Sequence, residues 1–296
     1  MADFRIDQAA GLRRLFGASQ LQVITFTAGC EGVGRSSSVA NLAAVLARLG
    51  KEVLVIDENS SADDVAFCFG ARTKGDLWHV LNGDARLAEI VLQPMPGLNV
   101  LPAAKAAKKL WTLSRSQQKA FLAAIQQLER PVDIILVDAS TRHPQGCSPF
   151  ALASHETVVV LSASSASITE AYVLIKKISH HYHRRHFRIL VNKVKSYADA
   201  RSIYDNIAEV ARLRGIAQLD FAGALPVDEA MVHAGKLSRP VVLLTPESSS
   251  ANAYREIASD LLHWQQADGE FAGVEQFLEQ LLHLSQQLSP TALRVG

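Results

Sequence analysis

The residues best suited to chemistry in this sequence form one glycine-rich run. In order they are Gly29, Cys30, Glu31, Gly32, Val33, Gly34, Arg35, Ser36 and Ser37. The spacing of the outer glycines, followed by a basic residue and a hydroxyl, is that of a phosphate-binding loop. Backbone N–H groups at such glycines converge on phosphate oxygens, and the hydroxyl in the position of Ser36 binds Mg²⁺. The alternative is a tight turn between a strand and a helix that holds no ligand.

A strand and a helix must position this loop. The apolar run 21–27 predicts a buried strand before the loop, and the pattern that ends at Leu49 predicts a helix after it. The positive end of that helix would face a bound phosphate. Arg35 stands where a lysine is usual, so the charge is kept but on a wider, planar group.

The remaining chain alternates between predicted strands and predicted helices. We expect strands at 53–56, 98–101, 133–137, 157–161, 187–191 and 221–225. We expect helices at 4–17, 76–92, 115–129, within 163–178, at 199–213 and at 271–288. This alternation predicts an α/β protein in which one domain of three layers contains a mostly parallel, twisted sheet flanked by helices. Sites in such folds lie at the carboxyl ends of the strands, where Asp57 and Asp138 follow two of the predicted strands.

Composition limits the possible classes of protein. With 48% hydrophobic and 20% charged residues, the chain is expected to be globular, and its net charge of +1 attracts neither nucleic acid nor membrane. The cysteines Cys30, Cys68 and Cys147 are too widely spaced for a disulfide framework, which favours a reducing cytoplasm. The basic stretch 176–188 is interpreted as a solvated helix end, so we expect no direct binding of nucleic acid.

These residues resemble the MinD/ParA group of P-loop ATPases over residues 20–265. The likeness is carried by the glycine-rich loop, by Asp57, Asp138 and Asn192, and by the segments SASITEAYVLIKK and ALPVDEAMVHAGKLSRPVV. The opening DQAAGLR is similar to the DQAxxLR motif of one branch, the flagellar number regulators called FlhG or FleN. On this basis the chain divides into a partner-binding helix (1–19), a P-loop domain (20–265) and an amphipathic tail (266–296).

The resemblance implies a nucleotide site with ATP or ADP and Mg²⁺ as ligands. It assigns phosphate binding to the loop, including Arg35. Contacts with the base are assigned to Asn192, Pro226 and Asp228. The residues around the metal would be Ser36, Asp57 and Asp138.

Several positions besides Arg35 depart from the family pattern. Cys30 replaces a lysine that reaches across a dimer, and Glu31 replaces a glycine beside the phosphates. Asn59 stands at the position of the catalytic aspartate, and an amide cannot take up a proton. Losing one preorganised charge costs about 10²–10³ in rate. We therefore expect a degenerate P-loop, with nucleotide binding weakened or lost and hydrolysis very slow or absent.

The resemblance also implies partners. The DQAxxLR helix would contact an SRP-type GTPase, FlhF, through Asp7, Gln8, Ala9, Leu12 and Arg13. Flagellar switch-complex proteins, a flagellar transcription activator and a second copy of the chain are further expected partners. The tail helix is a candidate for binding the inner face of the cell membrane, but its glutamates Glu270, Glu275 and Glu279 favour packing within the protein or docking on a protein partner.

Two other functions stay open. One is an active MinD-like ATPase switch that cycles between a monomer and a membrane-bound dimer. The other is a MinD/ParA-like accessory protein outside flagella, for example in cellulose secretion.

Overall fold

The computed structural model describes residues 21–59, 64–125, 131–141, 143, 147–264 and 274–287. The predicted helix 4–17, with its partner residues Asp7, Gln8, Ala9, Leu12 and Arg13, lies outside the described residues. So do the ends of the tail, 266–273 and 288–296.

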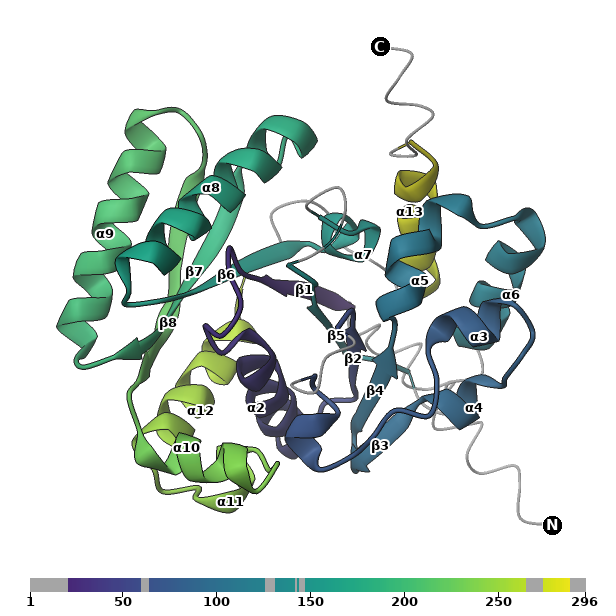
Figure 1. Ribbon diagram of the computed structural model, residues 1–296, viewed down its shortest axis with the longest axis horizontal. Helices are drawn as coiled ribbons and strands as arrows, with labels where there is room; N and C mark the ends of the chain where they lie inside the picture. The colour runs from purple at the N-terminus through teal and green to yellow at the C-terminus, as the bar shows by residue number, and fades with distance from the viewer. Residues whose placement is uncertain are drawn as a thin grey trace.

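Within the described residues, the strands form one eight-stranded sheet in the order β3-β4-β2-β5-β1-β6-β7-β8 (Figure 1). The strands are β1 Gln22–Thr27, β2 Val53–Asp57, β3 Leu92–Met95, β4 Leu98–Pro102, β5 Ile134–Asp138, β6 Glu156–Ser162, β7 His186–Val194 and β8 Gln218–Pro226. Neighbouring strands pair in parallel, except that β3 pairs with β4 antiparallel. The predicted mostly parallel sheet is therefore confirmed. The strands β1, β2 and β5 are apolar runs because helices bury both of their faces.

Helices cover both faces of this sheet (Figure 1). One face is covered by α2 Arg35–Arg48, α10 Glu229–Lys236, α11 Val241–Leu244 and α12 Ser249–Leu261. The other is covered by α3 Leu77–Leu81, α4 Leu87–Ile90, α5 Ala104–Lys109, α6 Arg115–Ile125, α7 Pro149–Ala153, α8 Ser165–Tyr182, α9 Tyr197–Leu213 and α13 Val274–Gln287. Short 3₁₀ helices lie at Phe67–Phe69 and Leu110–Thr112. The predicted three layers are confirmed.

The single helix predicted at 76–92 is wrong. The segment forms α3 and α4 with a turn between them, and then enters the edge strand β3. Asn82 ends α3, and Gly83 follows with a φ of 80°, a left-handed conformation that a helix cannot continue through. The strand β3 contains Pro94, which is tolerated because an edge strand has one unpaired side.

The interpretation of 176–188 as a solvated helix end holds for its exposed lysines and for Arg185, but it is wrong for Arg184 and Arg188. Arg184 donates to the carbonyl oxygens of Leu152, Ser154 and His155 at 2.6–3.1 Å, so it caps the end of α7. Arg188 pairs with the buried Glu156, with 3.0 Å between Nε and Oε2. Arg184 and Arg188 therefore stabilise the fold.

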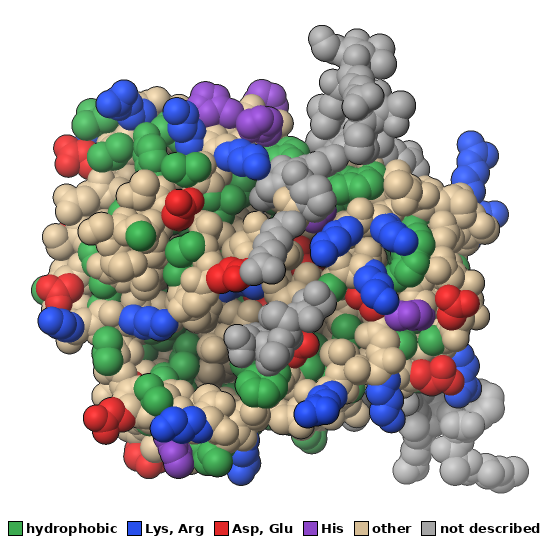
Figure 2. Space-filling model, in the orientation of Figure 1, with side chains coloured by type: hydrophobic (Ala, Val, Ile, Leu, Met, Phe, Trp, Pro, Cys, Tyr) green, Lys and Arg blue, Asp and Glu red, His purple; other side chains and the backbone are tan. Residues whose placement is uncertain are grey.

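Figure 2 shows histidine side chains at the upper edge of this face of the molecule, and elsewhere basic, acidic and apolar side chains are interspersed.

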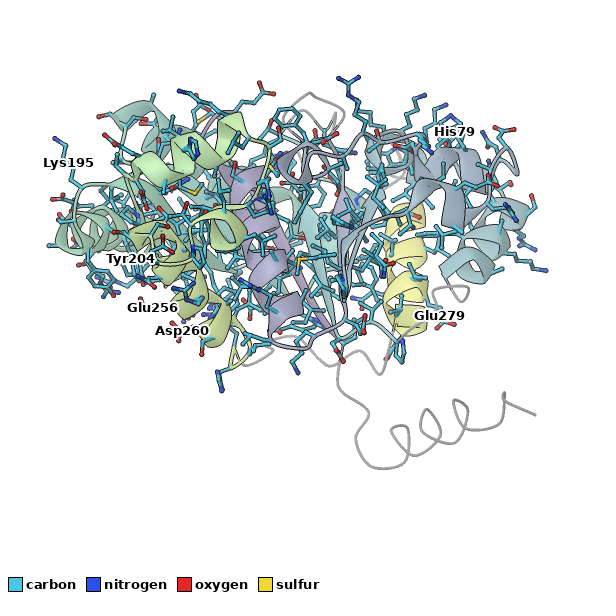
Figure 3. All side chains as sticks on the ribbon, turned by 90° about the horizontal axis from the view of Figure 1, so that it is seen from below. His79, Lys195, Tyr204, Glu256, Asp260 and Glu279 are labelled. Carbon is cyan, nitrogen blue, oxygen red and sulfur yellow. The ribbon has the colours of Figure 1, made fainter. Side chains whose placement is uncertain are left out.

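The tail helix α13 packs on the body of the protein. Its apolar face is buried against α6 and α7, with Phe277 and Leu281 both at 0% exposure. Glu279 is exposed on the outer side of the same helix (Figure 3). Among the described residues, the structure has no helix long and apolar enough to cross a membrane.

We expect Leu281→Ala to lower the free energy of unfolding by about 3 kcal/mol, because it leaves a cavity between α13 and the domain. Urea denaturation of the full chain measures this. The exposed neighbour Gln280→Ala is the matched control and should change stability by less than about 0.5 kcal/mol. Equal, small effects of both substitutions would mean that α13 is not packed on the domain in solution.

Candidate functional site

The glycine-rich loop follows β1, near the centre of the sheet, and leads into α2. Gly29 lies against the backbone of α8, and a Cβ at this position would overlap Glu170 and Ala171. Gly34 caps α2 with a φ of 90°, and a Cβ there would overlap the amide of Asn192. The two glycines are therefore required by close backbone packing as well as by the turn.

A cavity of about 810 Å³ opens over this loop. The loop residues Cys30, Glu31, Gly32, Val33, Gly34, Arg35, Ser36 and Ser37 line it, but Gly29 does not, and Glu31 is exposed. Its size lies in the range of small-ligand sites. Pro226 and Asp228 line it, but the sequence prediction missed other lining residues on this side, Met231, Val232, Ser238, Arg239 and Pro240. The sequence did contain a signal for these residues. The segment after β8 was recognised as part of the family likeness, but only Pro226 and Asp228 in it were assigned to the nucleotide site.

The side chain of Arg35 turns toward the strand ends. Its Nε donates to Asp138 Oδ1 at 2.5 Å, and its Nη2 donates to Asn59 Oδ1 at 2.8 Å. Ser36 Oγ donates to the other carboxylate oxygen of Asp138 at 2.6 Å. The pair is buried, with side-chain exposures of 10% for Arg35 and 0% for Asp138. Removing one partner of such a buried pair costs about 3–5 kcal/mol, because it leaves the other charge unpaired.

Asn59 and Asp57 extend this network. Asn59 Nδ2 donates to Asp138 Oδ2 at 2.8 Å and to Asp57 Oδ1 at 3.0 Å. Asp57 Oδ2 accepts from the backbone N–H of Val65 at 2.7 Å. Burial, and then the charge of Asp138, raise the pKa of Asp57 to about 8. Asn59 therefore bridges the two strand-end carboxyl groups.

The structure brings the predicted metal residues Ser36, Asp57 and Asp138 together, but their arrangement does not fit a bound Mg²⁺. Both oxygens of Asp138 are occupied by donors, from Arg35 on one side and from Ser36 and Asn59 on the other. A cation at this place would also lie beside the guanidinium, where like charges repel. The pocket that a metal needs is filled by the side chains themselves.

Asn192 and Lys193 hold the loop from the opposite side. Asn192 Nδ2 donates to the carbonyl oxygen of Val33 at 2.7 Å, and its Oδ1 accepts from the N–H of Lys193 at 2.7 Å. Lys193 Nζ donates to the carbonyl oxygen of Gly32 at 2.7 Å. The amide that was assigned to the adenine base is therefore engaged with the loop.

Asp228 and Glu58 have structural bonds that the sequence did not predict. Asp228 caps α10 through the N–H of Ala230 and accepts from the N–H of Ser250, both at 2.9 Å. Glu58 is buried beside the cavity, and it accepts from the hydroxyl of Ser148 and from the N–H of Ser140. Burial raises the pKa of Glu58 to about 7. Glu58 thus connects the site to the start of α7, which begins after Ser148.

A glycine loop after a central strand of a parallel sheet, with strand-end carboxyl groups beside it, defines a P-loop nucleotide-binding protein. The family model described as AAA domain matches residues 21–190. The chain is 27% identical over 272 residues to the antiactivator FleN of Pseudomonas aeruginosa, covering 92% of this chain and 97% of that protein. It is 29% identical over 204 residues to the flagellum site-determining protein YlxH of Helicobacter pylori, covering 68% of each.

Solved structures show the same fold. The MinD cell division protein of Aquifex aeolicus matches with a TM-score of 0.63 at 21% identity, over 82% of this chain and 98% of that one. MinD of Pyrococcus horikoshii OT3, complexed with Mg-ADP, matches with a TM-score of 0.61 at 19% identity, over 84% and 100%. The chain belongs to the MinD/ParA family of P-loop ATPases, in the branch that contains FleN.

We expect Asn192→Ala to lower the free energy of unfolding, measured in urea without nucleotide, by about 1–3 kcal/mol. The reason is that the buried carbonyl of Val33 loses its donor. The exposed Asn252→Ala is the control and should have little effect. If Asn192 served only to contact a base, its loss would leave the stability of the nucleotide-free protein unchanged.

Proposed function

We propose that this protein is a FlhG/FleN-like regulator of flagellar number and placement that acts mainly by binding other proteins. Two relatives support this proposal by name, an antiactivator and a flagellum site-determining protein. The DQAAGLR motif at residues 7–13 supports it independently. A role outside flagella, such as cellulose secretion, has no such motif in its favour. The protein would act in the cytoplasm, or at the inner face of the membrane through its partners.

We further propose that ATP hydrolysis by this site is very slow. The observation that carries the proposal is that Arg35 donates hydrogen bonds to Asp138 and Asn59. These bonds hold the guanidinium at the strand ends, where its charge is directed to Asp138. Asn59 adds a second defect, since an amide can hold a water molecule but cannot accept its proton. Two such losses need not add, but together they leave little rate acceleration.

An active, membrane-cycling ATPase is the second candidate. It is favoured by the cavity of about 810 Å³, which is large enough for a nucleotide. It is disfavoured by Cys30 in place of the lysine that would reach a second copy, and by the packing of α13, whose apolar face is buried in the protein.

The N-terminal motif is the proposed binding site for an FlhF-type GTPase, with Gln8 and Arg13 in contact roles. Flagellar switch-complex proteins and a transcription activator are further proposed partners. The motif lies outside the described residues, so the proposal depends on the sequence pattern and on the relatives.

Hydrolysis of ATP by the wild-type chain is expected to stay near background in a phosphate-release assay. The double variant Arg35→Lys/Asn59→Asp should raise the rate about 100-fold or more, because it restores a compact ammonium and a carboxylate. The two single variants are the controls and should gain less. Wild-type turnover equal to that of a MinD-type ATPase assayed alongside would refute the slow site.

Removal of residues 1–17 is expected to abolish capture of an FlhF-type GTPase by the full chain in a pull-down. The double variant Gln8→Ala/Arg13→Glu should do the same, because it removes a hydrogen-bonding group and reverses a charge. Arg14→Ala, next to the motif but outside it, is the matched control and should bind normally. In a deletion strain, only chains that bind should restore the normal number of flagella. Restoration by the truncated chain would contradict this role of the motif.

A further inference from the structure

The guanidinium of Arg35 contacts two of the three side chains assigned to a divalent cation, Asp138 and Ser36, and it also contacts Asn59. We propose that Arg35 takes the place of that cation, so that this site binds nucleotide without magnesium. The inference rests on the proposed function only in requiring that the cavity accepts a nucleotide.

The contacts of Arg35 are those of a cation held by oxygen atoms. Its Nε is 2.5 Å from Asp138 Oδ1, and its Nη2 is 2.8 Å from Asn59 Oδ1 and 3.4 Å from Ser36 Oγ. These oxygens come from the end of β5, from the segment after β2 and from the start of α2. The guanidinium therefore joins the same elements that a metal ion would join.

The remaining acceptor capacity of Asp138 is also used. Its Oδ2 accepts from Ser36 Oγ at 2.6 Å and from Asn59 Nδ2 at 2.8 Å. Mg²⁺ requires a nearly octahedral set of oxygen ligands and gives up its waters reluctantly. To bind here it would have to displace the guanidinium and break both of these hydrogen bonds.

Burial makes this displacement unfavourable. Asp138 is fully buried and the side chain of Arg35 is 10% exposed, so a displaced guanidinium would leave the carboxylate without its positive partner until the metal arrived. Asn59 contributes to the same preference, because its amide donates to Asp138 and accepts from Arg35 at once. A carboxylate at this position could not donate, and it would add a charge that attracts a divalent ion.

Arg35 can serve the nucleotide from this position. It lines the cavity over the loop together with Ser36 and Asn59. A guanidinium carries more N–H donors than the acceptors described around it, so it can donate to a phosphate oxygen while it stays bound to Asp138. Its planar fork suits this double role better than an ammonium group.

The test is the affinity for fluorescently labelled ADP, measured on the full chain with magnesium and with EDTA. For the wild type, the two dissociation constants should agree within about threefold, because no metal is needed. For Arg35→Lys, magnesium should tighten binding on the order of tenfold, since a shorter ammonium releases Asp138 and Ser36 for the metal.

Arg188→Lys is the matched control. Arg188 also forms a buried pair, with 3.0 Å between its Nε and Glu156 Oε2 and exposures of 13% and 1%. It lies on β7 and is not among the residues that line the cavity. Binding of ADP to Arg188→Lys should remain independent of magnesium. This result would show that weakening a buried arginine pair does not by itself create the magnesium dependence expected of Arg35→Lys.

Thermal unfolding without nucleotide gives a second measurement. Magnesium should leave the Tm of the wild type unchanged and raise the Tm of Arg35→Ala, because a metal that binds only the folded state stabilises it. A wild type that binds ADP only with magnesium, or that binds none in either condition, would overturn the inference. Hydrolysis is measured separately, so slow turnover combined with magnesium-dependent binding would refute this inference and leave the proposed slow ATPase intact.

Discussion

The ion pair between Arg35 and Asp138 is the interaction on which the rest of the site depends. The parallel register of β2 and β5 places Asp57 directly opposite Asp138, so two carboxyl groups meet at the strand ends in a buried environment. Two buried negative charges at this separation are unfavourable. The structure resolves this in two ways, because Arg35 neutralises Asp138 while the raised pKa of Asp57 favours its neutral form near pH 7.

The loop is fixed from both halves of the sheet. On the β5 side it is held by Arg35 and Ser36, and on the β7 side by Asn192 and Lys193, which bond the carbonyls of Val33 and Gly32. Gly29 lets it rest against α8. Such a loop is preorganised by its own protein, and it does not need a ligand to acquire its shape.

The cavity over the loop is open, while the side chains proposed for the metal are bonded to their neighbours. Asp138 accepts from Arg35, Ser36 and Asn59, and Asn59 accepts from Arg35. The protein therefore keeps the framework of a nucleotide-dependent switch. Its α13 is packed on α6 and α7, which makes that helix part of the folded body.

The sequence by itself determined the fold class, the central loop and the family. Apolar runs with strand length, each followed by a helical pattern, permit few arrangements other than a parallel sheet, and the seven predicted strands were found. It failed at 76–92, where local periodicity continued across the turn at Gly83 and concealed the edge strand β3. Periodicity reports which residues face a core, and it is silent about a short strand such as β3 that lies at the sheet edge and pairs on one side only.

Only the tertiary structure decided what the site residues do. The sequence could list Arg35, Asn59 and Asp138, but their separation of up to 103 residues leaves their contacts undetermined. Arg35 turns toward the strand ends because Asp138 lies buried at the end of β5, between β1 and β2. Asn192 bonds to the loop because the end of β7 lies close to it. Residue types fix which bonds are possible, whereas burial and register choose among them, because a buried charge must be paired where it lies.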